Sequence, residues 1–166
     1  MLPTGTGKTL VFSKVVEEEV RKGEKALILA HRGELLDQAS DKLYQTTGLT
    51  TSLEKAESTS IGSCERVTVA SVQTLSQEAR LKKFKKDDFG VIVVDEAHHA
   101  MSETYQRVLK YFDSAKVLGV TATPDRADQK NLGQFFDSKA YEYTLHQAVK
   151  EGYLCPVKAQ MIPLEL

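Results

Sequence analysis

Four short hydrophobic runs recur along the chain. They are Ala26–Ala30, Val67–Ala70, Val91–Val94 and Val117–Val120. Within each run the apolar residues are largely continuous and do not alternate with polar ones, a pattern typical of strands covered on both faces. The runs therefore predict four buried strands.

The segments between the runs carry hydrophobic residues at helical spacing. Three segments have such a hydrophobic stripe: Phe12, Val15, Val16 and Val20; Leu35, Leu36, Ala39 and Leu43; and Tyr105, Val108, Leu109 and Phe112. We expect Gly23 to be the C′ residue of the first helix and Ser102 to be the N-cap of the third. Strand alternating with helix predicts an α/β fold, in which helices cover both faces of a parallel sheet. Ligands of such folds bind beyond the carboxyl ends of the strands.

Composition narrows the class of protein. The 166 residues, 41% of them hydrophobic, suit one soluble domain. Lys and Arg total 22 against 23 Asp and Glu, a net charge of −1, so any nucleic-acid contact must be local. Cys64 and Cys155 form no zinc or disulfide pattern, which fits a reducing cytoplasm. No apolar stretch approaches the length of a membrane span, and we expect no secretory signal, because Met1-Leu2 runs directly into Pro3.

A glycine-rich loop opens the first predicted helix. It consists of Pro3, Thr4, Gly5, Thr6, Gly7, Lys8 and Thr9. Free backbone N–H groups at a helix N-terminus can hold phosphate oxygens there, with Lys8 reaching the β- and γ-phosphates and Thr9 binding Mg²⁺. Leu2 stands where the strict pattern has its first glycine. The alternative is a turn that caps a helix beside an exposed lysine.

An acidic pair ends the third predicted strand, in the sequence Asp95-Glu96-Ala97-His98. Asp95 is placed to hold Mg²⁺, and Glu96 to orient or deprotonate an attacking water. Alone, such a pair is more often a solvated loop or a cap, but together with Lys8 and Thr9 it predicts phosphoryl chemistry. His98 and His99 lack the spacing of a zinc site, and a hydrogen-bonding role is expected for His98.

The fourth strand ends in Thr121-Ala122-Thr123-Pro124, which holds two hydroxyls near the acidic pair. Together these segments resemble the first RecA-like motor lobe of superfamily 2 helicases and translocases, in the DEAH-bearing bacterial group related to the type III restriction motor subunit. The matching segments are Pro3–Thr9 as motif I, Ala30-His31-Arg32 with Leu36 and Gln38 as motif Ia, Asp95–His98 as motif II and Thr121–Thr123 as motif III.

The resemblance implies a RecA-like P-loop NTPase fold, a three-layer α/β/α sandwich with a mainly parallel central sheet. It implies ATP and Mg²⁺ as ligands and catalytic roles for Lys8, Asp95, Glu96 and His98. It also implies that Thr121, Ala122 and Thr123 couple the nucleotide state to strand binding.

The expected contacts to a sugar-phosphate backbone come from two strand ends, and they are His31, Arg32, Ser71, Gln73 and Thr74. Because both segments follow parallel strands, they share one edge of the sheet, where Arg and hydroxyl groups suit phosphate oxygens. The alternative is that His31 and Arg32 cap the next helix and that Ser71 is only an N-cap. The basic run at 82–86 is interpreted as a solvated surface, since no aromatic residues interleave with it.

The resemblance also implies parts that these residues do not supply. A buried strand should precede the phosphate loop, and a second RecA-like lobe should supply an arginine finger. We therefore expect residues 1–166 to be the first lobe of a longer protein, poorly active alone, with no membrane partner. Its expected track is nucleic acid, DNA rather than RNA. The alternatives are a translocating subunit of a restriction system and a non-catalytic nucleotide-sensing module.

Overall fold

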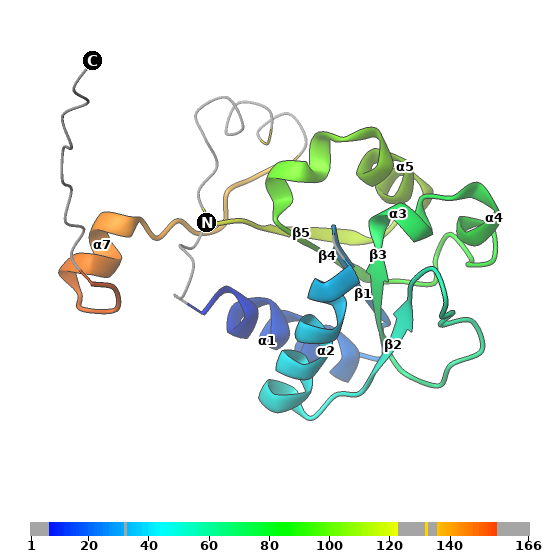
Figure 1. The fold of residues 1–166 in the computed structure, drawn as a ribbon, viewed down its shortest axis with the longest axis horizontal. Coiled ribbons are helices and arrows are strands. Elements are labelled where there is room, and N and C mark those ends of the chain that lie inside the picture. The colour runs from blue at the N-terminus through cyan, green and yellow to red at the C-terminus, as the bar shows by residue number, and fades with distance from the viewer. Residues whose placement is uncertain (1–6, 32, 123–131, 133–135, 156–166) are drawn as a thin grey trace, which may run out of the picture.

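The fold is built around a sheet of five parallel strands, in the order β2-β3-β1-β4-β5 (Figure 1). The structure is a computed structural model that describes residues 7–31, 33–122, 132 and 136–155. The strands are β1 (Ala26–Ala30), β2 (Thr51–Glu54), β3 (Val67–Ser71), β4 (Val91–Asp95) and β5 (Lys116–Val120). The parallel sheet predicted from the hydrophobic runs is confirmed.

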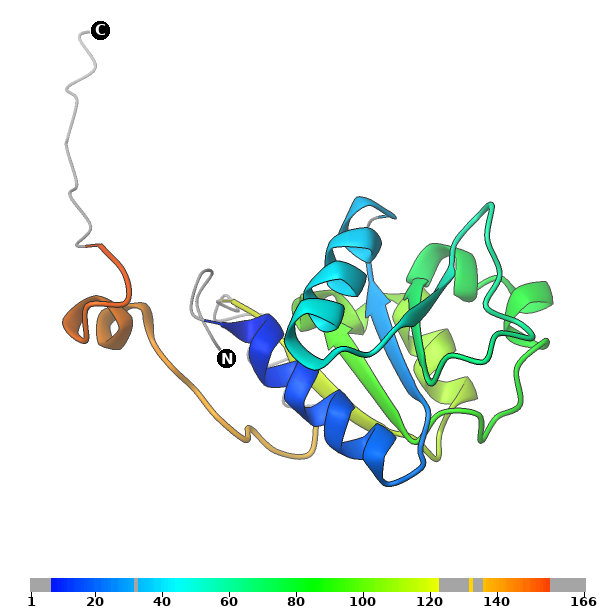
Figure 2. The same ribbon diagram turned by 90° about the horizontal axis from the view of Figure 1, so that it is seen from below.

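Helices cover both faces of this sheet (Figures 1 and 2). One face carries α1 (Lys8–Arg21) and α2 (Gly33–Thr47). The other carries α3 (Val72–Leu75), α4 (Glu78–Leu81) and α5 (Glu103–Tyr111). The arrangement is a three-layer sandwich, as expected.

Strand β1 shows why its hydrophobic run is continuous. Leu27 and Leu29 point into the core beneath α3 and α5, whereas Ile28 points into the core beneath α1 and α2. All three side chains are completely buried. Because β1 lies between β3 and β4 and is covered from both sides, none of its positions faces water.

Among the described elements, five short ones were not predicted from the sequence: β2, α3, α4, the 3₁₀ helix η1 (Ala97–Met101) and α7 (Leu145–Lys150). Strand β2 is mostly polar and lies at the edge of the sheet, where only β3 pairs with it. Helices of one turn are too short to show a hydrophobic period. Such elements form because tertiary contacts hold them, and local sequence signals them weakly.

The predicted end of α1 at Gly23 and the predicted start of α5 at Ser102 are both present, but the Ser102 side chain makes a different hydrogen bond from the one expected of an N-cap. Gly23 adopts φ 93° as the C′ residue of α1, and its N–H donates to the Val20 carbonyl while the Glu24 N–H donates to the Glu19 carbonyl. These two hydrogen bonds satisfy backbone carbonyls of the last turn that have no N–H partner within the helix. Ser102 is the N-cap of α5, but its hydroxyl contacts Thr104 Oγ1 and caps no backbone N–H.

Helix α7 (Leu145–Lys150) lies apart from the sheet and its covering helices in both views (Figures 1 and 2). It begins at a capping box, in which Thr144 Oγ1 accepts from the Gln147 N–H and the Gln147 side chain accepts from the Thr144 N–H. Within the described part of the chain, no helix has the length and apolar character needed to cross a bilayer.

Candidate nucleotide and nucleic-acid site

The first turn of α1 meets the carboxyl end of β4. Lys8 Nζ lies 3.4 Å from Glu96 Oε1, across 88 residues of sequence. Gly7, the N-cap residue, adopts the left-handed φ of 86° and offers no side chain to cap the helix. Gly7 thus leaves the N–H groups of this turn uncapped, and N–H groups at a helix N-terminus can bind an anion, with the positive charge of Lys8 beside them.

Glu96 has an unusual backbone conformation. Its φ of 52° and ψ of 56° lie in the left-handed region, and among the described residues no other non-glycine residue has positive φ. Asp95 Oδ1 accepts a hydrogen bond of 3.0 Å from the Glu96 N–H. Such strain costs about 1–3 kcal/mol and recurs at functional sites. Here it turns the chain from β4 into η1 and leaves the Glu96 side chain between Lys8 and His98.

Asp95, at the end of β4, is half-buried. Burial raises the pKa of its carboxyl above the usual range, and the neighbouring Glu96 carboxylate raises it further. The Glu96 N–H, Lys8 and Lys42 lower that pKa, but they do not cancel the effect of burial. Burial destabilises the ionised form of this carboxyl group, and a cation bound beside it would stabilise that form.

His98 joins the acidic pair to the end of β5. Its Nδ1 lies 3.1 Å from Thr121 Oγ1 and 3.4 Å from Glu96 Oε2. The hydrogen-bonding position expected for His98 is thus present, with Thr121 as its partner. Gly119, two residues earlier in β5, permits this approach: a Cβ there would lie 2.9 Å from the Ala97 Cβ and 2.5 Å from the Phe136 ring.

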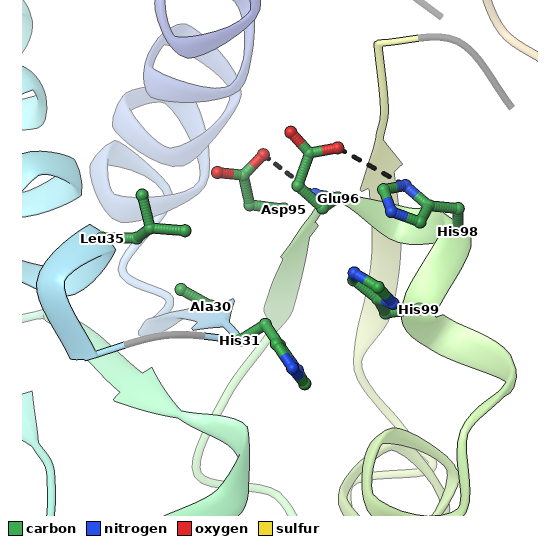
Figure 3. Close-up of a pocket in the computed structure, with 7 residues that line it drawn as sticks. All are labelled: Ala30, His31, Leu35, Asp95, Glu96, His98 and His99. Atoms are coloured by element: carbon green, nitrogen blue, oxygen red, sulfur yellow. Dashed lines mark hydrogen bonds and ion pairs between the residues drawn. The ribbon is translucent and has the colours of Figure 1, made fainter.

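A pocket of about 390 Å³ opens between the carboxyl ends of β1 and β4 (Figure 3). Its lining residues are Ala30, His31, Leu35, Asp95, Glu96, His98 and His99. In Figure 3 the two carboxylates lie next to each other, His98 lies beside Glu96, and His99 and His31 lie farther from the carboxylates. The described residues contain no group of three or more His, Cys, Asp and Glu side chains placed to hold a metal ion.

The predicted nucleic-acid contacts divide into exposed and buried side chains. His31 and Gln73 are exposed and lie together, with the Gln73 amide donating to His31 Nδ1 at 3.1 Å. Ser71 and Thr74 are over nine-tenths buried. Ser71 is the N-cap residue of α3, yet its hydroxyl donates to Gln73 Oε1 at 2.9 Å. In this arrangement Ser71 orients Gln73, and His31 and Gln73 face the solvent.

Several predicted site residues lie outside the described residues, namely Thr4, Gly5, Thr6, Arg32 and Thr123. Thr9 is half-buried in the first turn of α1, and Ala122 is half-buried after Thr121. The structure therefore brings together Lys8, Glu96, His98 and Thr121 by direct contact.

Two residues of the pocket were missed as site candidates. His99 appears in the sequence analysis only as a residue without the spacing of a zinc site, and Leu35 only as one position of a hydrophobic helical stripe. The available signal was topological: residues that directly follow parallel strands β1 and β4 must share one edge of the sheet. That signal places His31 near His99, which the spacing of the two residues along the chain does not suggest.

Comparison with known proteins gives the family. The family model described as "Type III restriction enzyme, res subunit" matches residues 1–126. A putative ATP-dependent helicase, IRC3 of Saccharomyces cerevisiae, is 32% identical over 178 residues, covering 99% of this chain and 26% of that protein. A type I restriction enzyme EcoAI endonuclease subunit of Escherichia coli is 28% identical, covering 100% of this chain and 21% of that protein.

Solved structures share the fold. The helicase domain of Pyrococcus furiosus Hef superposes with a TM-score of 0.69 at 28% identity, covering 80% of this chain and 31% of that chain. Saccharomyces cerevisiae Dbp5 bound to RNA and ADP BeF3 gives a TM-score of 0.71 at 21% identity, covering 87% of this chain and 41% of that chain. The RecA-like fold expected from the sequence is confirmed.

The chain spans about a quarter of the length of the curated relatives it matches. The family model matches residues 1–126, which is most of this chain, and the sheet of this chain has the RecA-like arrangement. The chain therefore belongs to the family of the type III restriction enzyme res subunit, as an N-terminal RecA-like lobe of superfamily 2.

Proposed function

We propose that residues 1–166 form the ATP-binding motor lobe of a helicase or translocase, which couples magnesium-ATP hydrolysis to movement on nucleic acid. One observation carries the proposal. The lysine of the glycine-rich loop, Lys8, lies 3.4 Å from Glu96, the acid that ends β4. A phosphate-binding helix terminus and a candidate base are thereby held at one edge of the sheet, which phosphoryl transfer to water requires.

Each side chain has a distinct proposed role. Lys8 binds the β- and γ-phosphates, which draws it away from Glu96. Glu96, released from that ion pair, orients or deprotonates the attacking water. His98 holds the Glu96 carboxylate from the other side through its contact at 3.4 Å.

The residues present fit a magnesium ion. Asp95 offers carboxylate oxygens and Thr9 a hydroxyl, and hard oxygen ligands of this kind suit Mg²⁺. The raised pKa of Asp95 supports the assignment, because a buried carboxylate is stabilised by a divalent cation. Mg²⁺ bound there would neutralise charge on the phosphates of ATP.

The proposed track is nucleic acid, with DNA favoured over RNA. Relatives at 28–32% identity include a DNA 3'-5' translocase XPB2 of Sulfurisphaera tokodaii, and among the same relatives one is named a putative ATP-dependent RNA helicase, from Methanocaldococcus jannaschii. His31 and Gln73, exposed at the ends of β1 and β3, are the proposed contacts to the sugar-phosphate backbone. They read no base sequence, which suits a motor that must move along any sequence.

A second RecA-like lobe is the proposed partner within the same protein. The fraction of the relatives that this chain spans, 26% for IRC3, leaves room for such a lobe in the longer proteins. In this arrangement ATP is bound between the lobes, and hydrolysis changes how they close on nucleic acid.

A restriction translocase is the second candidate. It is favoured by the family model and by the similarity to the EcoAI endonuclease subunit. Such a protein would move along duplex DNA without separating its strands. Displacement of a triplex-forming oligonucleotide without strand separation would support this candidate, whereas release of a labelled strand would support a helicase.

The deciding experiment measures magnesium-ATP hydrolysis by the full-length protein alone and with single- or double-stranded DNA or RNA. Stimulation by one nucleic acid is the expected result, and it would identify the track. Glu96→Gln should retain ATP binding and lower turnover by about 10²–10⁴-fold, because the base is lost while its shape is kept. Glu103→Gln, an exposed acid of α5, is the matched control. ATP binding without stimulated turnover in the wild type would instead favour a nucleotide-sensing module.

A further inference from the structure

A second line of contacts leaves His98, in addition to its bond to Thr121. The His98 ring lies 4.1 Å from the His99 ring, measured between centroids, with the planes tilted by 47°. The His99 ring stacks on His31 at 4.8 Å with an interplanar angle of 24°. Figure 3 shows the three rings following one another along the wall of the pocket. The line therefore runs from the candidate base to the exposed end of β1.

The line continues from β1 to β3. The Ser71 hydroxyl donates to Gln73 Oε1, which fixes the orientation of the amide group. The amide nitrogen then faces His31, and because an amide nitrogen can only donate, His31 Nδ1 is the acceptor. His31 is thus held from both sides, by a ring stack on one and a directed hydrogen bond on the other.

The two ends of the line meet different ligands in the proposed function. At one end, Glu96 is shared between Lys8 at 3.4 Å and His98 at 3.4 Å. A nucleotide that attracts Lys8 leaves the carboxylate to His98 and so changes the position of the first ring. At the other end, His31 and Gln73 are the exposed proposed contacts to nucleic acid.

The His99 ring contacts both of its neighbours, with centroids 4.1 Å from the His98 ring and 4.8 Å from the His31 ring. Aromatic rings at such distances are in contact. A shift of His98 would therefore change its contact with His99 and, through His99, the stack on His31. The bond from His98 to Thr121 passes toward β5 and away from His31, so it cannot replace this route.

We propose that His99, through its stack on His31, is a positioning residue that couples the nucleotide state at Glu96 to nucleic-acid binding at His31 and Gln73. The inference rests on the proposed function and adds a named route to it. The coupling is measured by a coupling factor, which is the ratio of the nucleic-acid affinity with bound nucleotide to the affinity without it.

The test measures that factor in the full-length protein. Fluorescence anisotropy gives the affinity for a labelled single- or double-stranded DNA, without nucleotide and with a non-hydrolysable ATP analogue. His99→Ala is expected to reduce the coupling factor about fivefold or more toward one, since coupling of this kind is typically worth 5- to 150-fold. His99→Phe, which keeps a flat ring for stacking, is expected to retain it. His146→Ala, an exposed histidine of α7, is the matched control.

The outcomes separate this inference from the proposed function. A wild type whose DNA affinity does not respond to the analogue would contradict the proposed function itself. A responsive wild type together with an equally responsive and folded His99→Ala would overturn the role of His99. Loss of coupling in a folded His99→Phe would also overturn it, because the stack would then not be the link. Circular dichroism and thermal melting of each variant establish that it is folded.

Discussion

Lys8 shows how one side chain can serve two states of a site. Without nucleotide its ammonium group is paired with Glu96, with 14% of the side chain exposed. Phosphate oxygens offer a lysine stronger charge-assisted hydrogen bonds than one carboxylate oxygen at 3.4 Å. In the proposed function, Lys8 therefore exchanges Glu96 for the phosphates when a nucleoside triphosphate binds, and Glu96 becomes free to orient the water.

Lys8→Ala tests this exchange. We expect nucleotide affinity to fall by about 10- to 100-fold or more, because charge-assisted hydrogen bonds to the terminal phosphates are lost. Titration calorimetry or a fluorescent ATP analogue gives the affinity. Lys14→Ala, an exposed lysine of the same helix paired with Glu17, should leave it unchanged. Unaltered affinity in Lys8→Ala would mean that the loop has only a structural role.

Asp95 provides a prediction on stability and pH. Burial raises its pKa, so the folded protein holds the Asp95 proton more tightly than the unfolded chain does, and the ionised carboxylate costs stability at neutral pH. Asp95→Asn should therefore raise the melting temperature by about 1–3 °C at pH 7 without Mg²⁺. The gain should shrink as the pH falls through the raised pKa and vanish below the usual pKa of aspartate.

Thermal melting over this pH range, with and without Mg²⁺ and nucleotide, measures the effect. In the proposed function Asp95 is a ligand of Mg²⁺, so the wild type should be stabilised by Mg²⁺ with nucleotide and Asp95→Asn should not be. Asp113→Asn, at an exposed aspartate, is the control. A lower melting temperature for Asp95→Asn at pH 7 would show that the carboxylate stabilises the apo fold.

At the scale of elements, the sheet edge is held by a buried acid. Glu54 of β2 is completely buried, and its Oε2 accepts from the Ser60 N–H at 2.7 Å. Arg80 of α4 donates to Glu54 Oε1 at 2.7 Å and to the Ala56 carbonyl at 2.9 Å. This cluster ties β2, the loop after it and α4 together. It explains how a short polar strand keeps its place at the edge of the sheet.

Arg80→Ala should weaken this edge selectively. It leaves the Glu54 carboxylate buried without its cation, which costs about 3–5 kcal/mol. Hydrogen–deuterium exchange of the β2 amides should accelerate by about 100-fold or more in the full-length protein, while β4 exchange changes little. Lys82→Ala breaks the exposed pair with Glu78 and should leave the exchange of the β2 amides nearly unchanged, because an ion pair in water contributes little to stability. Equal exchange in Arg80→Ala and the wild type would show that Glu54 does not need this partner.

The whole molecule, in the proposed function, is more than this lobe. The described part of the site supplies a lysine, two acids and a histidine, and the resemblance assigns an arginine finger to the second lobe. Such a finger is worth about 10³–10⁵ in turnover. We therefore expect residues 1–166 alone to hydrolyse ATP that much more slowly than the full-length protein, and to bind nucleotide weakly.

Steady-state hydrolysis by the chain alone and by the full-length protein, at matched concentrations and saturating Mg²⁺, compares the two. Glu96→Gln in the full-length protein sets the background rate. Comparable turnover in both would mean that the lobe carries its complete catalytic apparatus.

The layered α/β fold and the two segments of the candidate site could be predicted from the sequence. Continuous apolar runs such as Val91–Val94 can be satisfied only when both faces of a strand are covered, so a covered parallel sheet followed from local pattern. The glycine-rich loop at Gly7 and Lys8 and the acids after Val94 were recognisable because phosphate and magnesium chemistry demands particular residue types at short spacings.

The sequence did not show which strand ends are neighbours or which side chains face solvent, and both follow from the tertiary structure. The order β2-β3-β1-β4-β5 brings His31 against His99 and Gln73 against His31, contacts between residues more than 40 positions apart. It also buries Ser71 and Thr74, which the sequence analysis lists among the expected contacts to the sugar-phosphate backbone. The physical reason is that strand order and side-chain burial depend on how distant segments pack, and a local hydrophobic period carries no information about distant partners.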